Sequence, residues 1–162
     1  YHPFVYRVAL GLCGCREDSA DIVQETFLAF LDNVESFDSG RAKVSTWLYR
    51  VARNRALDRY RRRARERGVV ERLEPSTEGS RDGLIQEQEQ RTWLRAALPS
   101  LPPRAREVFV LRVGLGKTTE QTAELVGCSR AAVAVALHSA CQKLKSAREG
   151  LDSRERNNEK PA

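Results

Sequence analysis

The chain has 162 residues, enough for one medium-sized domain or two small ones. Hydrophobic residues make up 41% and charged residues 31%, and 28 Lys and Arg against 22 Asp and Glu give a net charge of +6. This composition predicts a globular protein with a small core and favours a polyanionic partner. There is no run of about 20 apolar residues that would cross a bilayer, and no apolar segment follows a basic start, so we expect neither membrane insertion nor a signal peptide. The chain starts at Tyr1 and contains no methionine, so we expect the translated product to begin before Tyr1.

The cysteines suggest neither a disulfide framework nor a metal site. Four cysteines are too few for a disulfide-built secreted domain of this length. Cys13 and Cys15 are separated by one residue, not by the two of a zinc knuckle, and no histidine lies nearby. We therefore expect reduced thiols that pack as small hydrophobic groups, with no metal and no cofactor.

Apolar residues recur with the 3.6-residue period of an α-helix along the chain, and no long segment alternates with period two. The first predicted helix carries Phe4, Val5, Val8, Ala9 and Leu12. The second runs from Asp18 to Val34, and its expected apolar face consists of Val23, Phe27, Phe30, Leu31 and Val34. The opposite face is acidic and carries Asp18, Asp21, Glu25 and Asp32.

The third predicted helix is capped by Ser45, and its core stripe is Val44, Trp47, Leu48, Val51 and Ala52. It continues into a block with nine arginines and two acids between Arg50 and Arg67. Trp47, Tyr49 and Tyr60 lie among these arginines, which favours a surface that stacks bases and contacts phosphates of a single strand. The alternatives are a solvated charged face and a Trp47 that belongs to the core.

The second half of the chain is separated by a linker that we expect over residues 68–83, because its stretch from Glu74 to Gly83 has almost no apolar residue. Further helices are predicted over Leu84–Leu98, Pro103–Val113, Thr119–Val126 and Arg130–Ala147. Residues 148–162 are expected to form a disordered tail. The predicted fold is all-α, with two small helical domains joined by a flexible linker.

The last two predicted helices have the spacing of a helix-turn-helix. Ala123 is small enough for the two helices to approach, Gly127 accepts a left-handed conformation, and Val133 packs the second helix down. Ser129 is placed to cap the second helix. The alternative is a plain helical hairpin, but the basic balance of this segment favours DNA binding.

No enzymatic site is predicted. The stretch Gly114-Leu115-Gly116-Lys117-Thr118 resembles a phosphate-binding loop, but Leu111 stands where that motif needs glycine, and no strand precedes it. We find no paired nucleophile and base and no cluster of metal ligands. The chain is therefore expected not to be an enzyme.

Two sets of motifs resemble the extracytoplasmic-function (ECF) sigma factors of bacterial RNA polymerase. The segments Asp21–Leu28, Phe37-Asp38 and Ser45–Asn54 resemble their promoter-melting domain, and Leu101–Phe109 with the helix-turn-helix resembles their second domain. The resemblance runs from Tyr1 to about Ala147 in the right order. It implies a region 2 domain over residues 1–67 and a region 4 domain over residues 84–147.

The resemblance also implies roles for individual residues. Core polymerase, through its β′ clamp, is expected to contact Asp21, Gln24, Glu25 and Leu28. The −10 element, with a base flipped out of the duplex, is expected to contact Phe37, Ser39, Arg41, Lys43, Trp47, Arg50, Arg53, Asn54, Arg61 and Arg62. The −35 element is expected to contact Thr118, Ser129, Arg130, Ala131, Ala134 and His138.

The implied partners are core RNA polymerase, promoter DNA and an anti-sigma factor, and the implied location is the bacterial cytoplasm. Two features depart from the family: the first helix begins late, and Ala134, Ala136 and Ser139 stand where the family carries Lys and Arg. Two alternatives follow. One is a sigma-like regulator that docks on polymerase but lacks strong −35 readout, and the other is a stand-alone helix-turn-helix repressor.

Overall fold

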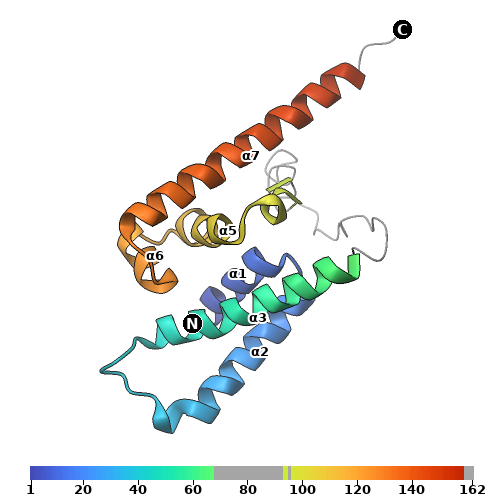
Figure 1. Ribbon diagram of the computed structural model, residues 1–162. Helices are drawn as coiled ribbons and strands as arrows, with labels where there is room; N and C mark the ends of the chain where they lie inside the picture. Colours follow the sequence, from blue (N-terminus) through green and yellow to red (C-terminus); the bar gives the residue numbers. More distant parts are fainter. Residues whose placement is uncertain (68–92, 95, 159–162) are drawn as a thin grey trace.

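The computed structural model describes residues 1–67, 93, 94 and 96–158, and these residues are largely helical, with no strand among them (Figure 1). The all-α prediction is confirmed. The elements in chain order are α1 (His2–Cys13), α2 (Arg16–Asn33), the 3-10 turn η1 (Val34–Ser36), α3 (Val44–Arg67), the 3-10 turn η2 (Leu98–Ser100), α5 (Pro103–Phe109), the π-helical turn η3 (Val110–Gly114), α6 (Thr119–Val126) and α7 (Arg130–Asn158). The linker expected over residues 68–83 and most of the helix expected over Leu84–Leu98 lie outside the described residues.

The first domain is a bundle of α1, α2 and α3. Helix α1 is buried along the stripe that its periodicity predicts, with Val5, Val8, Ala9 and Leu12 almost fully covered. Helix α3 contributes the buried residues Leu48, Tyr49, Ala52 and Ala56 to the same core. Three short helices thus share one apolar centre, which fixes the relative positions of their outer faces.

The core face of α2 differs from the predicted one. Its buried residues are Ser19, Ile22, Val23 and Thr26, and Phe27 and Phe30 are only partly covered. Leu31 and Val34 were predicted in the core but are 65% and 47% exposed. The apolar stripe on α2 is wider than the surface that α1 and α3 cover, so its C-terminal end remains in solvent.

Helix α3 begins two residues earlier than a cap at Ser45 predicts. Its first residue is Val44, and Lys43 O accepts backbone hydrogen bonds from Thr46 and Trp47. Ser45 therefore lies inside the first turn and is not the cap. Val44, Trp47 and Val51 are partly buried, so the prediction identified the side of α3 that faces the core. It omitted Tyr49 and Ala56, which are buried in the same cluster.

The second domain contains the predicted helix-turn-helix. Thr118 and Gln121 form a reciprocal capping box at the start of α6, with hydrogen bonds of 3.0 and 3.1 Å. Gly127 ends α6 with φ of 72°, a left-handed conformation that glycine adopts without strain. Ser129 Oγ accepts the Ala132 backbone N–H at 3.1 Å, which confirms it as the cap of α7. Ala123 and Val133 are buried together with Val108.

Helix α7 is longer than predicted. It continues to Asn158, so residues 148–158 are helical, and the expected disordered tail is wrong over this stretch. Its middle part packs on α5 through Ala140 and Leu144, which lie in one cluster with Leu101, Ala105 and Phe109. Partly buried Trp93 and Leu94 cover the same cluster. No helix in the described part of the chain is both long and apolar enough to cross a membrane.

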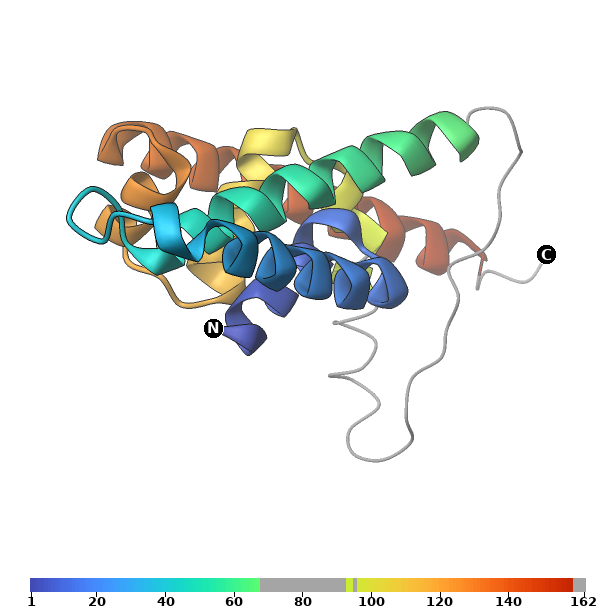
Figure 2. The ribbon, with the colours of Figure 1, turned by 90° about the horizontal axis from the view of Figure 1, so that it is seen from below.

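The two domains pack against each other, as both views of the ribbon show (Figures 1 and 2). Leu111 of η3 and Leu125 of α6 are buried in the apolar cluster of the first domain. The backbone of α1 comes close to η3 at Gly11, where a Cβ atom would lie 2.7 Å from both γ-methyl groups of Val110. A side chain at position 11 would therefore displace Val110 from this crossing.

Candidate functional site

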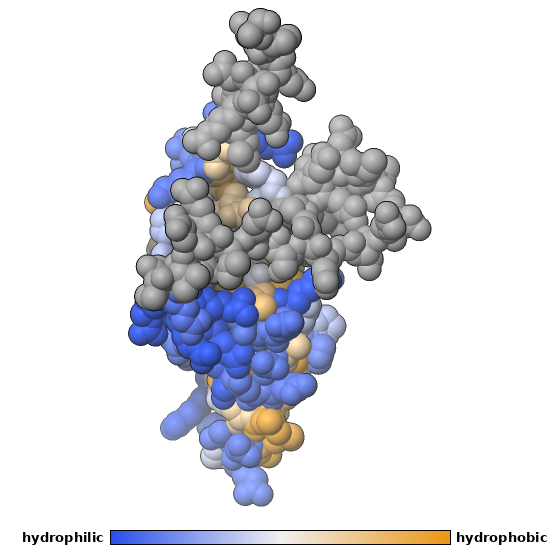
Figure 3. All heavy atoms as spheres, turned by 90° about the vertical axis from the view of Figure 1, so that its right-hand side faces the viewer, coloured by the Kyte–Doolittle hydropathy of each residue, from blue (hydrophilic) through white to orange (hydrophobic). Residues whose placement is uncertain are grey.

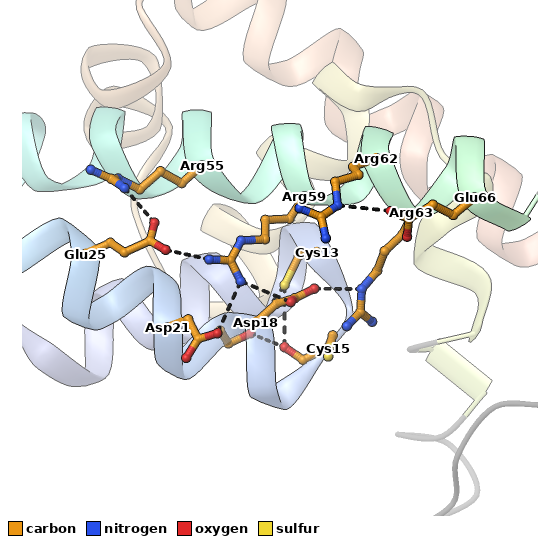
Figure 4. A network of polar contacts seen from close by, with 11 residues as sticks. Cys13, Cys15, Asp18, Asp21, Glu25, Arg55, Arg59, Arg62, Arg63 and Glu66 are labelled. Carbon is orange, nitrogen blue, oxygen red and sulfur yellow. Dashed lines mark hydrogen bonds and ion pairs between the residues drawn. The ribbon is translucent and has the colours of Figure 1, made fainter.

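A network of ion pairs joins α2 to α3 along their facing sides (Figure 4). Glu25 accepts hydrogen bonds from Arg55 and Arg59, each at 2.5 Å. Asp18 Oδ1 accepts a hydrogen bond from Arg59 at 3.1 Å. The other carboxylate oxygen of Asp18 lies 2.7 Å from Arg63 Nε and forms an ion pair with it, without a well-aligned hydrogen bond. The side chain of Asp18 is only 13% exposed, so this part of the network is largely withdrawn from water.

This network changes the interpretation of both charged segments. The acidic residues of α2 were predicted to form a free face opposite the core, but Asp18 and Glu25 point toward α3, and Asp21 lies 3.3 Å from Arg59. Three arginines of the basic block are correspondingly neutralised by α2 and are not available to bind phosphates. Their acidic partners lie 30 to 45 residues earlier, on a different helix, so the sequence pattern of the basic block does not reveal them.

The outward side of α2 carries a mixed polar and apolar surface. Gln24 is exposed, Leu28 is 60% exposed, and the next turns add the exposed Leu31 and Val34. Figure 3 shows a hydrophobic patch near the lower end of the molecule, where Figure 1 places the end of α2. Exposed apolar patches on a protein surface are typical of contact sites for other macromolecules when they are large. Gln24 and Leu28 were predicted to contact polymerase, whereas Leu31 and Val34 were predicted to lie in the core.

Three aromatic rings connect the loop before α3 to the start of that helix. The ring of Phe30 lies 5.6 Å from that of Phe37 and 5.4 Å from that of Trp47, both edge to face. Phe37 and Trp47 are partly buried, while Ser39 and Arg41 are exposed, and Arg41 pairs with Asp38 at 3.4 Å. Of the loop residues that were predicted to hold a flipped base, Phe37 belongs to this aromatic cluster, whereas Ser39 and Arg41 are exposed.

The remaining candidates for the −10 element on α3 do not share one face. Arg50 and Asn54 are exposed one turn apart, so they lie side by side. Arg53 points instead to Glu107 of α5, and its Nη1 also donates to Asn54 Oδ1 at 3.1 Å. Arg61 and Arg62 are exposed and pair within α3, with Asp58 at 3.4 Å and Glu66 at 3.0 Å.

Tyr49 was predicted to lie among the exposed arginines but is 1% exposed. Its hydroxyl donates to the Glu107 carboxylate. Burial and the neighbouring carboxylate raise the pKa of Tyr49 far above its usual value. Tyr49 cannot stack on a base in this arrangement. Tyr60 is partly buried under the Arg106 guanidinium, which lies 4.1 Å from the ring centre.

The candidates for the −35 element lie at the start of α7 and at the cap of α6. Arg130 is exposed and pairs with Glu120 at 3.0 Å. Ala131, Ala134 and His138 are exposed, as is Val135 at 70%. Thr118 and Ser129 use their hydroxyl groups to cap helices. The exposed face of this helix is thus mainly apolar, with one paired cation at its start.

Comparison with known proteins agrees with these features. Residues 1–66 match Sigma-70 region 2 and residues 91–144 match Sigma-70, region 4. The chain is 31% identical over 144 residues to the ECF RNA polymerase sigma factor EcfG of Rhodopseudomonas palustris, which covers 89% of this chain and 78% of the relative. It is 32% identical over 151 residues to the ECF RNA polymerase sigma factor SigD of Mycobacterium tuberculosis, with 88% and 71% covered.

Two solved structures have a similar fold. The sigma factor RpoE in complex with the anti-sigma factor NepR from Bartonella quintana has a TM-score of 0.62 at 24% identity, over 90% of this chain and 89% of that one. CnrH in complex with the cytosolic domain of CnrY has a TM-score of 0.66 at 23% identity, over 91% and 81%. With the region 2 and region 4 matches in the same order, these findings show that the chain belongs to the family of ECF sigma factors, which bind core RNA polymerase and direct promoter recognition and transcription initiation.

Proposed function

We propose that this chain divides the work of promoter initiation between its two domains, a region 2 domain over residues 1–67 and a region 4 domain over residues 84–147. The first domain docks on the β′ clamp of core polymerase and opens the −10 element. The second contacts the −35 element. The whole chain is a regulatory DNA-binding subunit of the bacterial cytoplasm and catalyses no reaction of its own.

The observation that supports the docking site is the exposed surface on the outward side of α2. Gln24, Leu28 and Leu31 follow each other at intervals of four and three residues, so they share one face. Asp21 and Glu25 flank this face while holding arginines of α3. We therefore assign the contact with polymerase mainly to Gln24 and Leu28, with Asp21 and Glu25 positioning α2.

The −10 element is assigned to the loop Phe37–Lys43 and to the exposed edge of α3. Flipping a base out of the duplex costs a few kcal/mol of stacking, which contacts to the captured base must offset. The partly buried Phe37 and Trp47 supply apolar ring surface, and Asn54 supplies both a donor and an acceptor. Arg50, one turn from Asn54, supplies a cation for a phosphate or a base carbonyl.

The −35 element is assigned to the start of α7, with low sequence discrimination. A bidentate contact to a base edge contributes about 1–3 kcal/mol of discrimination, and Arg130 is the cation at the start of this helix that has the reach for one. DNA shape and backbone contacts then carry most of the preference of this domain. A regulator that docks on polymerase but has lost −35 readout remains the second candidate, and the mainly apolar exposed face of α7 favours it.

An anti-sigma factor is a further proposed partner. The sigma factor RpoE, which has a similar fold, was solved bound to the anti-sigma factor NepR. The exposed apolar residues on α2 and α7 are surfaces to which such a protein would bind.

Run-off transcription with purified core polymerase tests the proposal. The wild-type chain is expected to start transcripts at a specific set of promoters, identified by sequencing the DNA that co-purifies with the holoenzyme. A double variant, Gln24→Ala with Leu28→Ala, is expected to lose core binding without a change in melting temperature, because both side chains are exposed. Binding of core without any promoter-specific transcript would favour the second candidate.

A further inference from the structure

Two cysteines lie on either side of the turn between α1 and α2. Cys13 is the last residue of α1, Cys15 is the N-cap of α2, and only Gly14 separates them. Gly14 has φ of 74° and ψ of 6°, a left-handed helical conformation that glycine adopts without strain. Residues on either side of a helical residue have Cα atoms roughly 5–6 Å apart, which is within the range of native disulfides. The backbone of this turn therefore already brings the two cysteines to a separation that a disulfide can span.

The Cys13 side chain points toward the start of α2 (Figure 4). Its Sγ lies 3.5 Å from the backbone oxygen of Cys15 and 3.4 Å from Ser19 Oγ, one turn into α2. Cys13 is 7% exposed, whereas Cys15 is partly exposed, and both thiols are free. Burial also raises the pKa of the Cys13 thiol. A reagent in solution therefore reaches Cys15 first, and the Cys13 sulfur lies behind it.

One cation of α3 lies beside both thiols. The Arg63 guanidinium is held by Asp18, with Nε 2.7 Å from the carboxylate, and it also contacts the Cys15 side chain (Figure 4). Its charge interacts with the sulfur atoms of both Cys13 and Cys15. Thiol–disulfide exchange carries negative charge from the attacking sulfur to the leaving sulfur. A guanidinium at this position stabilises that charge while it moves, as cations beside reactive cysteines do.

We propose that Cys13 and Cys15 are a redox-active pair, which a low-molecular-weight disulfide such as oxidised glutathione converts to an intramolecular disulfide. The Cys15 thiolate attacks one sulfur of oxidised glutathione, and a first glutathione thiolate leaves. The Cys13 thiol gives its proton to solvent and attacks the Cys15 sulfur of the mixed disulfide, and the second glutathione thiolate leaves. Two protein thiols are oxidised, and one glutathione disulfide is reduced to two thiols.

The bond is expected to be reversible. It closes over a single intervening residue, which forces a disulfide away from its preferred geometry and makes it more reducible. Its formation also removes the Cys15 thiol that Arg63 contacts and moves Cys13 Sγ away from Ser19 Oγ. The proposal does not depend on the proposed function of the chain, and its test needs no polymerase.

The test treats the reduced full chain with oxidised glutathione in the absence of denaturant, stops the reaction with acid and blocks the remaining thiols. Trypsin cuts after Arg7 and Arg16, so both cysteines of the pair fall in one peptide of residues 8–16, while Cys128 and Cys141 fall in two others. This peptide is expected to lose about two mass units, the hydrogen atoms of the two thiols. Because the second attack is intramolecular, the closed form is expected to exceed the glutathione adduct at least about tenfold. Excess dithiothreitol is expected to restore both thiols.

Matched variants separate the pair from the other thiols. In Cys13→Ser, the glutathione adduct at Cys15 is expected to persist, because the second thiol is missing. In the double variant Cys128→Ser with Cys141→Ser, the disulfide is expected to form as in the wild type. A persistent adduct at Cys15 of the folded wild-type chain, or modification confined to Cys128 and Cys141, would overturn the proposal. Circular dichroism checks that each chain is folded, and the wild type and the double variant decide the outcome if Cys13→Ser is not.

The contribution of Arg63 is tested in the same double variant. Arg63→Gln is expected to slow disulfide formation by about threefold, because the moving charge loses its cation. The matched control is Arg65→Gln, since Arg65 is exposed and its Nε lies 3.4 Å from Arg61 O within α3. This control is expected to leave the rate of disulfide formation unchanged. Equal rates in the two variants, with both chains folded, would overturn the role of Arg63.

Discussion

Replacing Asp18 by asparagine tests the network that joins α2 to α3. The substitution keeps the shape of the side chain but removes the charge that Arg59 contacts at 3.1 Å and Arg63 at 2.7 Å. A hydrogen bond to a charged group contributes about 1.5–3 kcal/mol. Arg59 keeps Glu25 as a partner, and asparagine still accepts one hydrogen bond, so we expect a loss of about 2 kcal/mol in the free energy of unfolding. For a chain of this length that corresponds to a fall of roughly 4–8 °C in melting temperature.

The measurement is urea denaturation followed by circular dichroism at a fixed pH near neutrality. The matched control is Asp58→Asn, the same chemical change in a pair that is 74% and 66% exposed and 3.4 Å apart. An exposed pair of this kind contributes little, so the control is expected to lose less than about 0.5 kcal/mol. Equal small losses in the two variants would show that the network does not stabilise the first domain and that the reasoning from burial is wrong.

The remaining predictions concern function and the thiols. Asn54→Ala is expected to slow open-complex formation on a duplex promoter by about tenfold and to have a much smaller effect on a template with a preformed bubble; equal loss on both templates would indicate a folding role. Reversing Asp21 and Glu25 to lysine is expected to abolish core binding and also to lower the melting temperature, because Glu25 contacts Arg55 and Arg59 at 2.5 Å; a stable variant that binds core normally would contradict both expectations. Arg130→Ala in the holoenzyme is expected to change the slope of log affinity against log salt by no more than about one, and a larger change would mean that α7 contacts more phosphates than its exposed residues suggest. Burial raises the pKa of the Cys13 thiol, so iodoacetamide should modify the exposed Cys141 first. The neutral Cys13 thiol should stabilise the fold fully below its unfolded pKa of about 9, and this contribution should be lost as the pH rises above that value. Denaturant titration at several alkaline pH values checks the sign of this change in the free energy of unfolding.

The sequence alone predicted most of the described helices and the helix-turn-helix, because these depend on local interactions. The 3.6-residue period places apolar residues on one side of a helix wherever that side is later buried. Gly127 and Ser129 act within a few residues of their own position, so their roles as helix end and cap could be predicted without a tertiary structure. The motifs around Asp21 and Trp47 likewise identified the family.

Tertiary structure decided which of the polar and apolar residues are available to partners. The helical period shows which side of a helix is apolar, but not how much of that side a neighbouring helix covers. Leu31 was therefore predicted to lie in the core, although it is exposed in the structure. The ion pairs of Asp18 and Glu25 join residues 30 to 45 positions apart, and the hydrogen bond from Tyr49 to Glu107 spans 58. Such contacts depend on how separate helices are placed, and local sequence patterns do not specify this placement. For the same reason, the packing of the second domain on the first could be found only in the folded chain.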